Sequence, residues 1–207
     1  MPKLEEICLT SSSNASLDFA ELKNPKLTQF KLNDSRPVAS SLFRYLDNSP
    51  EITDICFNDC EFSSWFEVFA VLELFCHTLQ RLELQSLRLD GTDRLSEYFD
   101  SLRYLKLGDC KIDKTLLMTF ISLCPRLEEV HLDCFSDVDD DVVLLLCQKL
   151  KHLKILTLDS YYITDSSADY IVKHCHTLKQ LFIRSYKLTN DGKEKLKSLK
   201  NVRLNVK

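Results

Sequence analysis

The chain has 207 residues, of which 44% are hydrophobic and 28% are charged, and its formal net charge at pH 7 is −4. This composition supplies enough apolar side chains for a continuous core, while so small a charge disfavours binding to nucleic acid or to an anionic membrane. No apolar run reaches the roughly 18 residues that a membrane span needs. Lys3, Glu5 and Glu6 place charge where a secretory signal would need an apolar core.

A spacing of leucine and isoleucine residues repeats along the whole chain. In its clearest copy, Leu153, Leu156 and Leu158 form the pattern L-x-x-L-x-L, a segment with helical spacing follows, and Leu178 begins the pattern again. The pattern begins nine times, at Leu4, Leu27, Ile52, Leu79, Leu102, Leu127, Leu153, Leu178 and Leu199. We therefore expect residues 1–207 to form a single domain of about eight repeats and a terminal strand.

The first four repeats differ in the segments that follow their strands. In the first, a polar stretch leads from Leu4, Ile7 and Leu9 to apolar residues: Leu17, Phe19 and Leu22. In the second, i, i+4 spacing predicts a buried helix face: Val38, Leu42, Phe43 and Leu46. In the third, residues 63–76 predict a helix with an aromatic core face: Trp65, Phe66, Phe69, Leu72 and Phe75. In the fourth, Gly91 indicates a turn, and Thr92 or Asp93 could cap a short helix, the weakest that we expect.

Repeats 5 to 7 each place aspartate where a helix should begin: Asp113, then Asp139 to Asp141, then Asp165. A carboxylate at this position accepts hydrogen bonds from the free N–H groups of the first turn and meets the positive end of the helix dipole. Repeat 8 closes with a basic segment at 193–200, and the spacing of Leu199, Val202 and Leu204 predicts a last strand.

Most of the nine cysteines fall at fixed positions of the repeat. Cys76, Cys124 and Cys175 each precede a repeat start by three residues, and Cys60 and Cys110 stand at position nine. These positions favour small apolar side chains, so we interpret the cysteines as buried free thiols. Free thiols are typical of a reducing compartment, and we expect the protein in the cytoplasm or the nucleus.

Three segments carry the finer pattern of the repeat: LCPRLEEVHLDC at 123–134, YITD at 162–165 and HCHTLKQLFI at 174–183. They resemble the cysteine-containing class of leucine-rich repeat, C-x-x-L-x-x-L-x-L-x-x-C-x-x-I-T-D, found in F-box/leucine-rich-repeat proteins and in related mitotic-exit antagonists without an F-box. The resemblance implies an α/β solenoid of the horseshoe type, with a curved parallel sheet of about nine strands on the concave face and helices on the convex face. The gap from Cys110 to Ile112 is one residue shorter than in the family. Tyr161 and Tyr186 replace the cysteine of position nine.

Residues 137–141 contain four aspartates and could suggest a calcium loop. Counted from Asp137, an EF-hand loop would need Gly in place of Val142 and Glu in place of Gln148. Helix capping is therefore the better interpretation.

Two cysteine and histidine clusters could suggest zinc, Cys56 with Cys60 and the segment 174–176. Cys56 should point out of the sheet while Cys60 points into the core, so one ion would not reach both. The sequence also holds no G-x-S-x-G, glycine-rich phosphate loop or H-E-x-x-H motif. We expect no metal, no cofactor, no catalytic residue and no enzyme activity.

Side chains between the leucine positions should point out of the concave sheet, because side chains alternate along a strand. The third-position column is Glu6, Gln29, Asp54, Arg81, Tyr104, Glu129, Ile155, Gln180 and Asn201. The fifth-position column is Cys8, Lys31, Cys56, Glu83, Lys106, His131, Thr157, Phe182 and Arg203. Both columns mix charges of the two signs.

Repeats 5 to 8 differ in exposing large apolar side chains beside charged ones, with Asp109, Asp133 and Asp159 along one edge. Such a surface is typical of an interface core, although scattered surface aromatics are also ordinary. The predicted partner-binding residues are Tyr104, Lys106, His131, Asp133, Ile155, Asp159, Phe182 and Arg184.

The predicted function is recognition of a protein partner on the concave face. The resemblance favours the substrate-recognition part of an F-box-type ubiquitin ligase receptor, in a Skp/cullin-type context. Only three residues precede Leu4, so we expect the F-box in a longer form or on a separate chain. The alternative is a free-standing scaffold that binds and sequesters a partner. A catalytic or GTPase-activating solenoid is a third class, which no residue constellation supports.

Overall fold

The computed structural model describes residues 6–10, 16–22, 26–91, 95–133 and 138–206. Its strands are β1 (Glu6–Thr10), β2 (Ser16–Leu17), β3 (Gln29–Pro37), β4 (Asp54–Cys60), β5 (Arg81–Gln85), β6 (Tyr104–Gly108), β7 (Glu129–Asp133), β8 (Ile155–Asp159), β9 (Gln180–Arg184) and β10 (Arg203–Val206). Its helices are α1 (Ala39–Asp47), α2 (Trp65–Glu73), α3 (Lys114–Ser122), α4 (Asp140–Lys149), α5 (Asp165–His174) and α6 (Asn190–Lys197). The predictions on Leu4, Thr92, Asp93, Cys134 and Asp137 lie outside the described residues.

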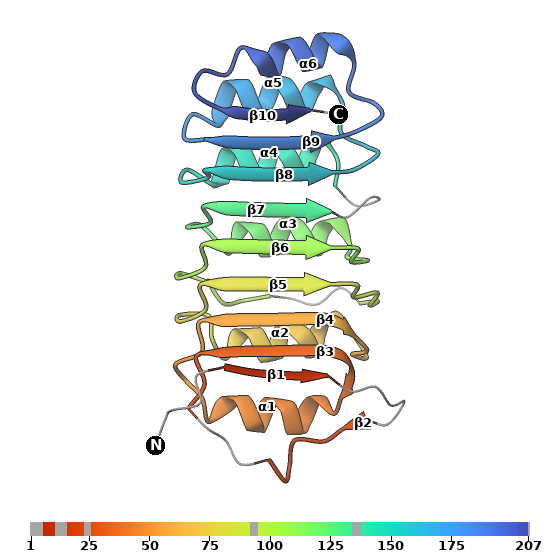
Figure 1. Cartoon of the computed structure of the whole chain (residues 1–207), viewed down its shortest axis with the longest axis vertical. Helices are drawn as coiled ribbons and strands as arrows, with labels where there is room; N and C mark the ends of the chain where they lie inside the picture. Colours follow the sequence, from red (N-terminus) through yellow and green to blue (C-terminus); the bar gives the residue numbers. More distant parts are fainter. Residues whose placement is uncertain (1–5, 11–15, 23–25, 92–94, 134–137, 207) are drawn as a thin grey trace.

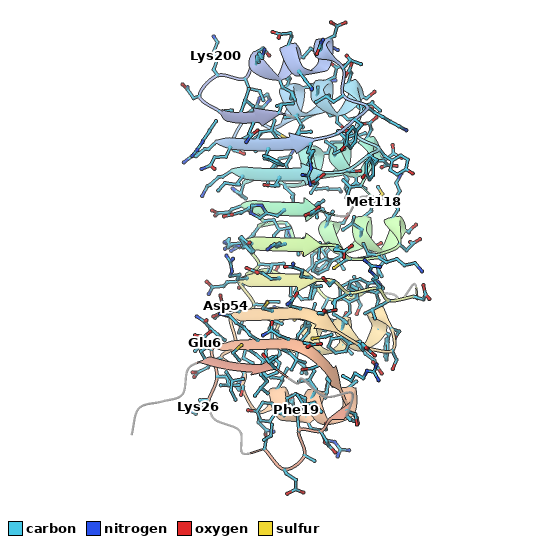
Figure 2. All side chains as sticks on the ribbon, turned by 45° about the vertical axis from the view of Figure 1, so that its right-hand side comes forward. Glu6, Phe19, Lys26, Asp54, Met118 and Lys200 are labelled. Atoms are coloured by element: carbon cyan, nitrogen blue, oxygen red, sulfur yellow. The ribbon has the colours of Figure 1, made fainter. Side chains whose placement is uncertain are left out.

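The strands form one parallel sheet in the order β1-β3-β4-β5-β6-β7-β8-β9-β10, with β2 paired to β3. Figure 1 shows the strands stacked in chain order, with the helices on one face of the sheet. Parallel neighbours need crossover connections, which places the helices there. In Figure 2, Glu6 and Asp54 project from the side of the sheet opposite Met118 of α3. We call this uncovered side the open face; it is the side that the horseshoe prediction makes concave. The predicted α/β leucine-rich-repeat solenoid is confirmed.

The core follows the leucine spacing. Leu156 and Leu158 are fully buried, and Leu153 is 1% exposed. At the start of each strand, the backbone N–H of the third-position residue bonds to the carbonyl of the second-position residue one repeat earlier, as Ile155 does to Glu128 at 3.1 Å. The same bond recurs up to β10, so it sets the register of the strands.

The fourth repeat has no helix in the part that the structure describes, so the predicted short helix is wrong there. Aromatic rings fill the space instead. The ring centroid of Phe120, on α3, lies 5.3 Å from that of Phe99 and 5.2 Å from that of Phe69, on α2. Trp65 is fully buried beside Phe69, and its Nε1 donates a 2.9 Å hydrogen bond to the carbonyl of Lys111. The aromatic face of α2, in repeat 3, therefore contacts repeat 5 across repeat 4.

Two exposed rings correct the predicted helix faces. Phe43 of α1 is 37% exposed and Phe66 of α2 is 58% exposed, although the spacing predicts both in the core. Tyr45 takes the core position in α1, between the buried Leu42 and Leu46. Successive residues in a helix point about 100° apart, so the buried face has a limited width, and Phe43 and Phe66 lie outside it.

The aspartates at the helix starts act in two ways. Asp113 caps α3 and Asp139 caps α4, each accepting two backbone N–H groups of the first turn, as predicted. In α5 the cap is Thr164, and Asp165 is the first helical residue. The Asp165 carboxylate accepts hydrogen bonds from the backbone and side chain of Thr189 in the next repeat, so it links two repeats.

Two kinds of turn follow the strands. In repeats 2 to 5 the residue at position eight, two after the buried sixth position, has a positive φ: Asp34, Asp59, Ser86 and Asp109. The next side chain then enters the core: Ser35, Cys60, Leu87 and Cys110. In repeats 7 and 8, Ser160 and Ser185 enter the core one place earlier, and each donates to a carbonyl of the preceding repeat. Tyr161 and Tyr186 are 49% and 81% exposed, so they do not replace the core cysteine.

The last strand departs from the predicted register. In β10, Arg203 lies opposite Gln180 and Asn205 lies opposite Phe182. The register of β10 is therefore shifted by two residues toward the C-terminus from the register predicted for a repeat that starts at Leu199. Arg203 belongs to the third-position column, and Asn205 to the fifth.

The eight described cysteines are free thiols, and six of them are buried. Burial raises the pKa of Cys60 to about 12 and that of Cys110 to about 11, so both remain protonated at neutral pH. Cys147 and Cys175 lie with their Sγ atoms 2.9 Å apart in the core between α4 and α5. The predicted packing role of these thiols is confirmed.

Candidate functional site

The open face of repeats 5 to 8 consists of three columns of side chains that cross the strands. The strand registers confirm the predicted third and fifth columns from β1 to β9. In this region the columns read Tyr104, Glu129, Ile155, Gln180; then Lys106, His131, Thr157, Phe182; then Gly108, Asp133, Asp159, Arg184. The structure thus places all eight predicted binding residues in these three columns, although Asp159 is buried.

Tyr104 is enclosed by its neighbours. The guanidinium carbon of Arg81 lies 3.4 Å from the centroid of the tyrosine ring, and the ring centroid of His131 lies 5.4 Å away. Burial and the charge of Glu83 raise the pKa of the Tyr104 phenol. A ring held in this way loses little freedom when a partner binds. The register puts Tyr104 two strands from Ile155, with β7 between them.

His131 is fixed at both ring nitrogens. Its Nδ1 lies 2.8 Å from the hydroxyl of Thr157, and its Nε2 lies 2.7 Å from the carboxylate of Glu129. The sequence analysis omitted Glu129 and Thr157 from the site, although strand alternation places both beside His131. Neither side chain is apolar, so neither fits the pattern of an interface anchor.

The seventh-position column brings carboxylates together. Asp159 is 6% exposed and forms an ion pair with Arg184. Asp133 has one oxygen, Oδ1, that is buried without a hydrogen-bond partner among the described residues. Burial raises the pKa of Asp133, and the charge of Asp159 raises it further. Asp109 is not in this column, since Gly108 is the register neighbour of Asp133.

A hollow of about 340 Å³ lies on the open face between β7 and β10. Its lining residues are Glu129, His131, Ile155, Leu156, Thr157, Gln180, Leu181, Phe182, Arg203 and Asn205. The hollow joins three of the predicted residues, His131, Ile155 and Phe182, and leaves out Tyr104. Arg203 and Asn205 reach it because of the shifted register of β10.

A second hollow, of about 370 Å³, lies on the open face of repeats 2 to 4 and contains Cys56. Cys56 thus points out of the sheet, as predicted, whereas Cys60 is buried. Burial and the charge of Glu83 raise the pKa of the Cys56 thiol. The charges around it pair with each other, Lys31 with Glu6 at 2.7 Å and Arg81 with Glu83. Most of the charges on this half of the open face are therefore already compensated by ion pairs within the chain.

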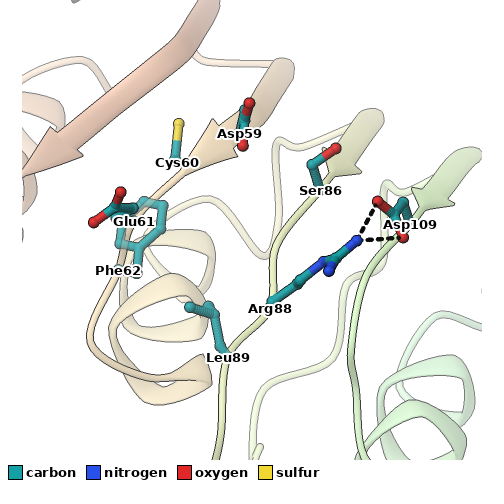
Figure 3. Close-up of a pocket in the computed structure, with 8 residues that line it drawn as sticks. All are labelled: Asp59, Cys60, Glu61, Phe62, Ser86, Arg88, Leu89 and Asp109. Atoms are coloured by element: carbon teal, nitrogen blue, oxygen red, sulfur yellow. Dashed lines mark hydrogen bonds and ion pairs between the residues drawn. The ribbon is translucent and has the colours of Figure 1, made fainter.

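A third hollow, of about 540 Å³, opens at the carboxyl ends of β4 to β6. Figure 3 shows Arg88 reaching across it to the carboxylate of Asp109, with a separation of 2.9 Å. Phe62 and Leu89 line it from below. The ion pair is well exposed, so it gives the hollow little fixed geometry. We place the candidate site on the open face instead.

Among the described residues, no group of three His, Cys, Asp or Glu side chains is arranged to hold a metal ion. No helix in the described ranges is both long and apolar enough to span a membrane.

The sequence matches no protein-family profile. Among solved structures, a protein from Bacteroides fragilis is similar, with a TM-score of 0.51 and 16% identity, over 86% of this chain and 65% of that chain. This chain therefore spans slightly less than two thirds of that protein. An internalin from Listeria monocytogenes gives a TM-score of 0.40 and 12% identity, over 88% of this chain and 69% of that one. At such identity the first similarity shows the fold alone, and the repeating parallel sheet is of the leucine-rich-repeat type, an architecture that commonly serves protein binding.

Proposed function

We propose that the chain is a protein-recognition module that binds its partner on the open face of repeats 5 to 8. The hollow that Ile155 and Phe182 line carries this proposal. The helices leave this face uncovered (Figure 1), and two apolar side chains line the hollow among charged ones. Apolar anchors with a polar rim are the usual centre of a protein interface.

Within this site, Tyr104 and Phe182 are the anchors. Lys106, His131 and Asp133 set the register of the partner, because fixed charges favour one orientation. Asp159 and Arg184 supply a neutral pair beside them.

A pull-down with the full chain, read by mass spectrometry, would identify the partner, and its affinity for variants would then test the surface. Phe182→Ala and Tyr104→Ala should each weaken binding about thirtyfold, because loss of an interface anchor costs about 2 kcal/mol or more. Lys31→Ala, in repeat 2 of the same face, is the matched control and should bind like wild type. Equal binding by all three variants would remove the open face from consideration.

The edges of the sheet are the rival surface. β1 and β10 each pair with one neighbour only in the described sheet. Unpaired strand edges invite strand addition by a partner or by a second copy of the chain. If deletion of residues 199–207 abolishes binding without unfolding the remainder, while the anchor variants bind normally, the edge is the site.

The cysteine-bearing repeat supports a more specific role, the substrate-recognition part of an F-box-type ubiquitin ligase receptor. The alternative is a free-standing scaffold that sequesters its partner. The same pull-down separates the two, since a receptor should bring a Skp-type adaptor and a cullin with its target. We expect residues 1–207 alone not to bind the adaptor directly; stoichiometric binding of purified adaptor to this chain would contradict that expectation.

A further inference from the structure

The charges on the open face of repeats 5 to 8 are unevenly compensated. Glu129 lies 2.7 Å from the imidazole of His131, and Asp159 pairs with Arg184. Within the described chain, Lys106 and Asp133 make no ion pair, with each other or with any third residue. Lys106 and Asp133 are therefore a cation and an anion that find no ion-pair partner in the described part of this face.

Asp133 is unfavourably placed in the free protein. Its Oδ1 is buried and accepts no hydrogen bond from the described residues. Burial raises the pKa of its carboxyl, the charges of Asp159 and Asp109 raise it further, and Arg184 and Lys106 oppose them. Arg184 is already bound to Asp159. A carboxylate that is partly withdrawn from water without a donor costs free energy, which a cation from outside would recover.

Gly108 places no side chain beside this carboxylate on the neighbouring strand. It is the register neighbour of Asp133 on β6, two residues after Lys106. A Cβ atom at Gly108 would lie 3.6 Å from the side chain of Gln85, which is an ordinary contact distance. Lys106 and Asp133 thus lie on adjacent strands, and no β6 side chain stands at the register position beside Asp133.

We propose that Asp133 binds a lysine or arginine side chain of the partner protein, while Lys106 binds an acidic side chain of the same segment. This inference rests on the proposed function and names the chemistry of its partner. Opposite charges on adjacent strands select one orientation of the bound segment. An arginine would add two parallel hydrogen bonds to the carboxylate. A nucleic acid is a poor fit, because Glu129, Asp133 and Asp159 would repel its phosphates.

Peptides selected from a random display library on the immobilised full chain are suitable probes. Selected peptides should carry a lysine or arginine, and Asp133→Asn should weaken their binding by at least about tenfold. Asp133→Lys should reverse the preference and enrich acidic peptides. Asp54→Asn, another open-face carboxylate, is the matched control and should leave affinity unchanged.

Two outcomes would count against the inference in different ways. Peptides that lose affinity with Phe182→Ala but bind Asp133→Asn like wild type would overturn it and leave the proposed function intact. Peptides indifferent to both Phe182→Ala and Tyr104→Ala would remove the proposed site together with the inference.

The stability of the free protein gives a second test that needs no ligand. Asp133→Asn keeps the shape of the side chain and removes the uncompensated charge. Its thermal midpoint at neutral pH should therefore equal or exceed that of wild type. A lower midpoint would mean that the carboxylate stabilises the fold, and would overturn its assignment to a partner.

Discussion

Repeats 2 to 5 (residues 27–126, the N-terminal block) and repeats 6 to 8 (residues 127–198, the C-terminal block) build one sheet from different cores. The N-terminal block has a chain of buried rings that ends at Phe120, in α3. After Phe120, the buried hydrophobic residues that the structure describes are aliphatic side chains and cysteines. Rings fill the core of the block in which the described part of one repeat has no helix, and aliphatic side chains fill the core of the block in which every repeat has one.

The helices differ in the same way. In α1 and α2 the cap residues Val38 and Ser64 make no side-chain hydrogen bond at the first turn. In the C-terminal block, Asp140 accepts bonds from Thr164 at the start of the next helix, and Asp165 does the same for Thr189. Regular helix spacing allows this ladder of polar contacts. The comparison shows that one repeat pattern can be stabilised by ring packing or by linked helix starts.

The largest expected effect is in the ring chain. Phe120→Ala should lower the free energy of unfolding by about 3–5 kcal/mol, because it removes a buried ring that touches two others. Trp65 is the only tryptophan and lies in this chain, so its fluorescence reports the N-terminal block in urea titrations. Phe66→Ala, on the exposed side of α2, should change stability by less than about 0.5 kcal/mol. Equal losses for the two variants would contradict the placement of the rings.

Leu156→Ala is the counterpart in the C-terminal block and should cost about 2–5 kcal/mol, because Leu156 is fully buried between repeats. Each repeat of a solenoid contacts only its neighbours, so the two blocks can unfold at different urea concentrations. The circular dichroism transition should therefore begin at lower urea than the Trp65 fluorescence transition in this variant. Coincident transitions would show that the blocks unfold as one unit, and an unchanged midpoint would mean that the strand register is wrong.

The leucine spacing predicted most strands and the third- and fifth-position columns. Leucine and isoleucine at positions one, four and six indicate which side chains are buried, and strand alternation then gives the exposed ones. The absence of a helix from the described part of repeat 4 could not be predicted in this way, since Phe99 and Phe120 meet only in the folded chain. Tyr161 was misplaced because the choice between two turn geometries depends on φ at a single position. The sequence also could not predict that Asp133 lacks an ion-pair partner among the described residues, because its neighbours on other strands are set by the folded sheet.

The two turn types predict opposite responses to glycine. Ser86 has φ of 57° in the N-terminal block, a conformation that costs an L-residue roughly 1–2 kcal/mol. Ser86→Gly relieves this cost, and after the entropy loss of glycine we expect a net gain of up to about 1 kcal/mol. Ser160→Gly should instead lose about 1–3 kcal/mol, since the Ser160 hydroxyl donates to the buried carbonyl of Val138. Urea denaturation of both variants measures the contrast, and a change of the same sign in both would contradict it.

The smallest expected effect is a pH dependence of the ladder. Hydrogen bonds from the side chain and then the backbone of Thr189 hold the pKa of Asp165 below its ordinary value of 3.8. A carboxyl with a lowered pKa in the folded state adds stability that is complete above its unfolded pKa and is lost as the pH falls through the folded one. Asp165→Asn should therefore lose less stability than wild type on acidification below about pH 4. Thermal midpoints measured between neutral pH and pH 3 test this, with Asp191→Asn, an exposed carboxylate on α6, as control. Parallel pH profiles for wild type and Asp165→Asn would show that the link between Asp165 and Thr189 contributes nothing to the stability of the C-terminal block.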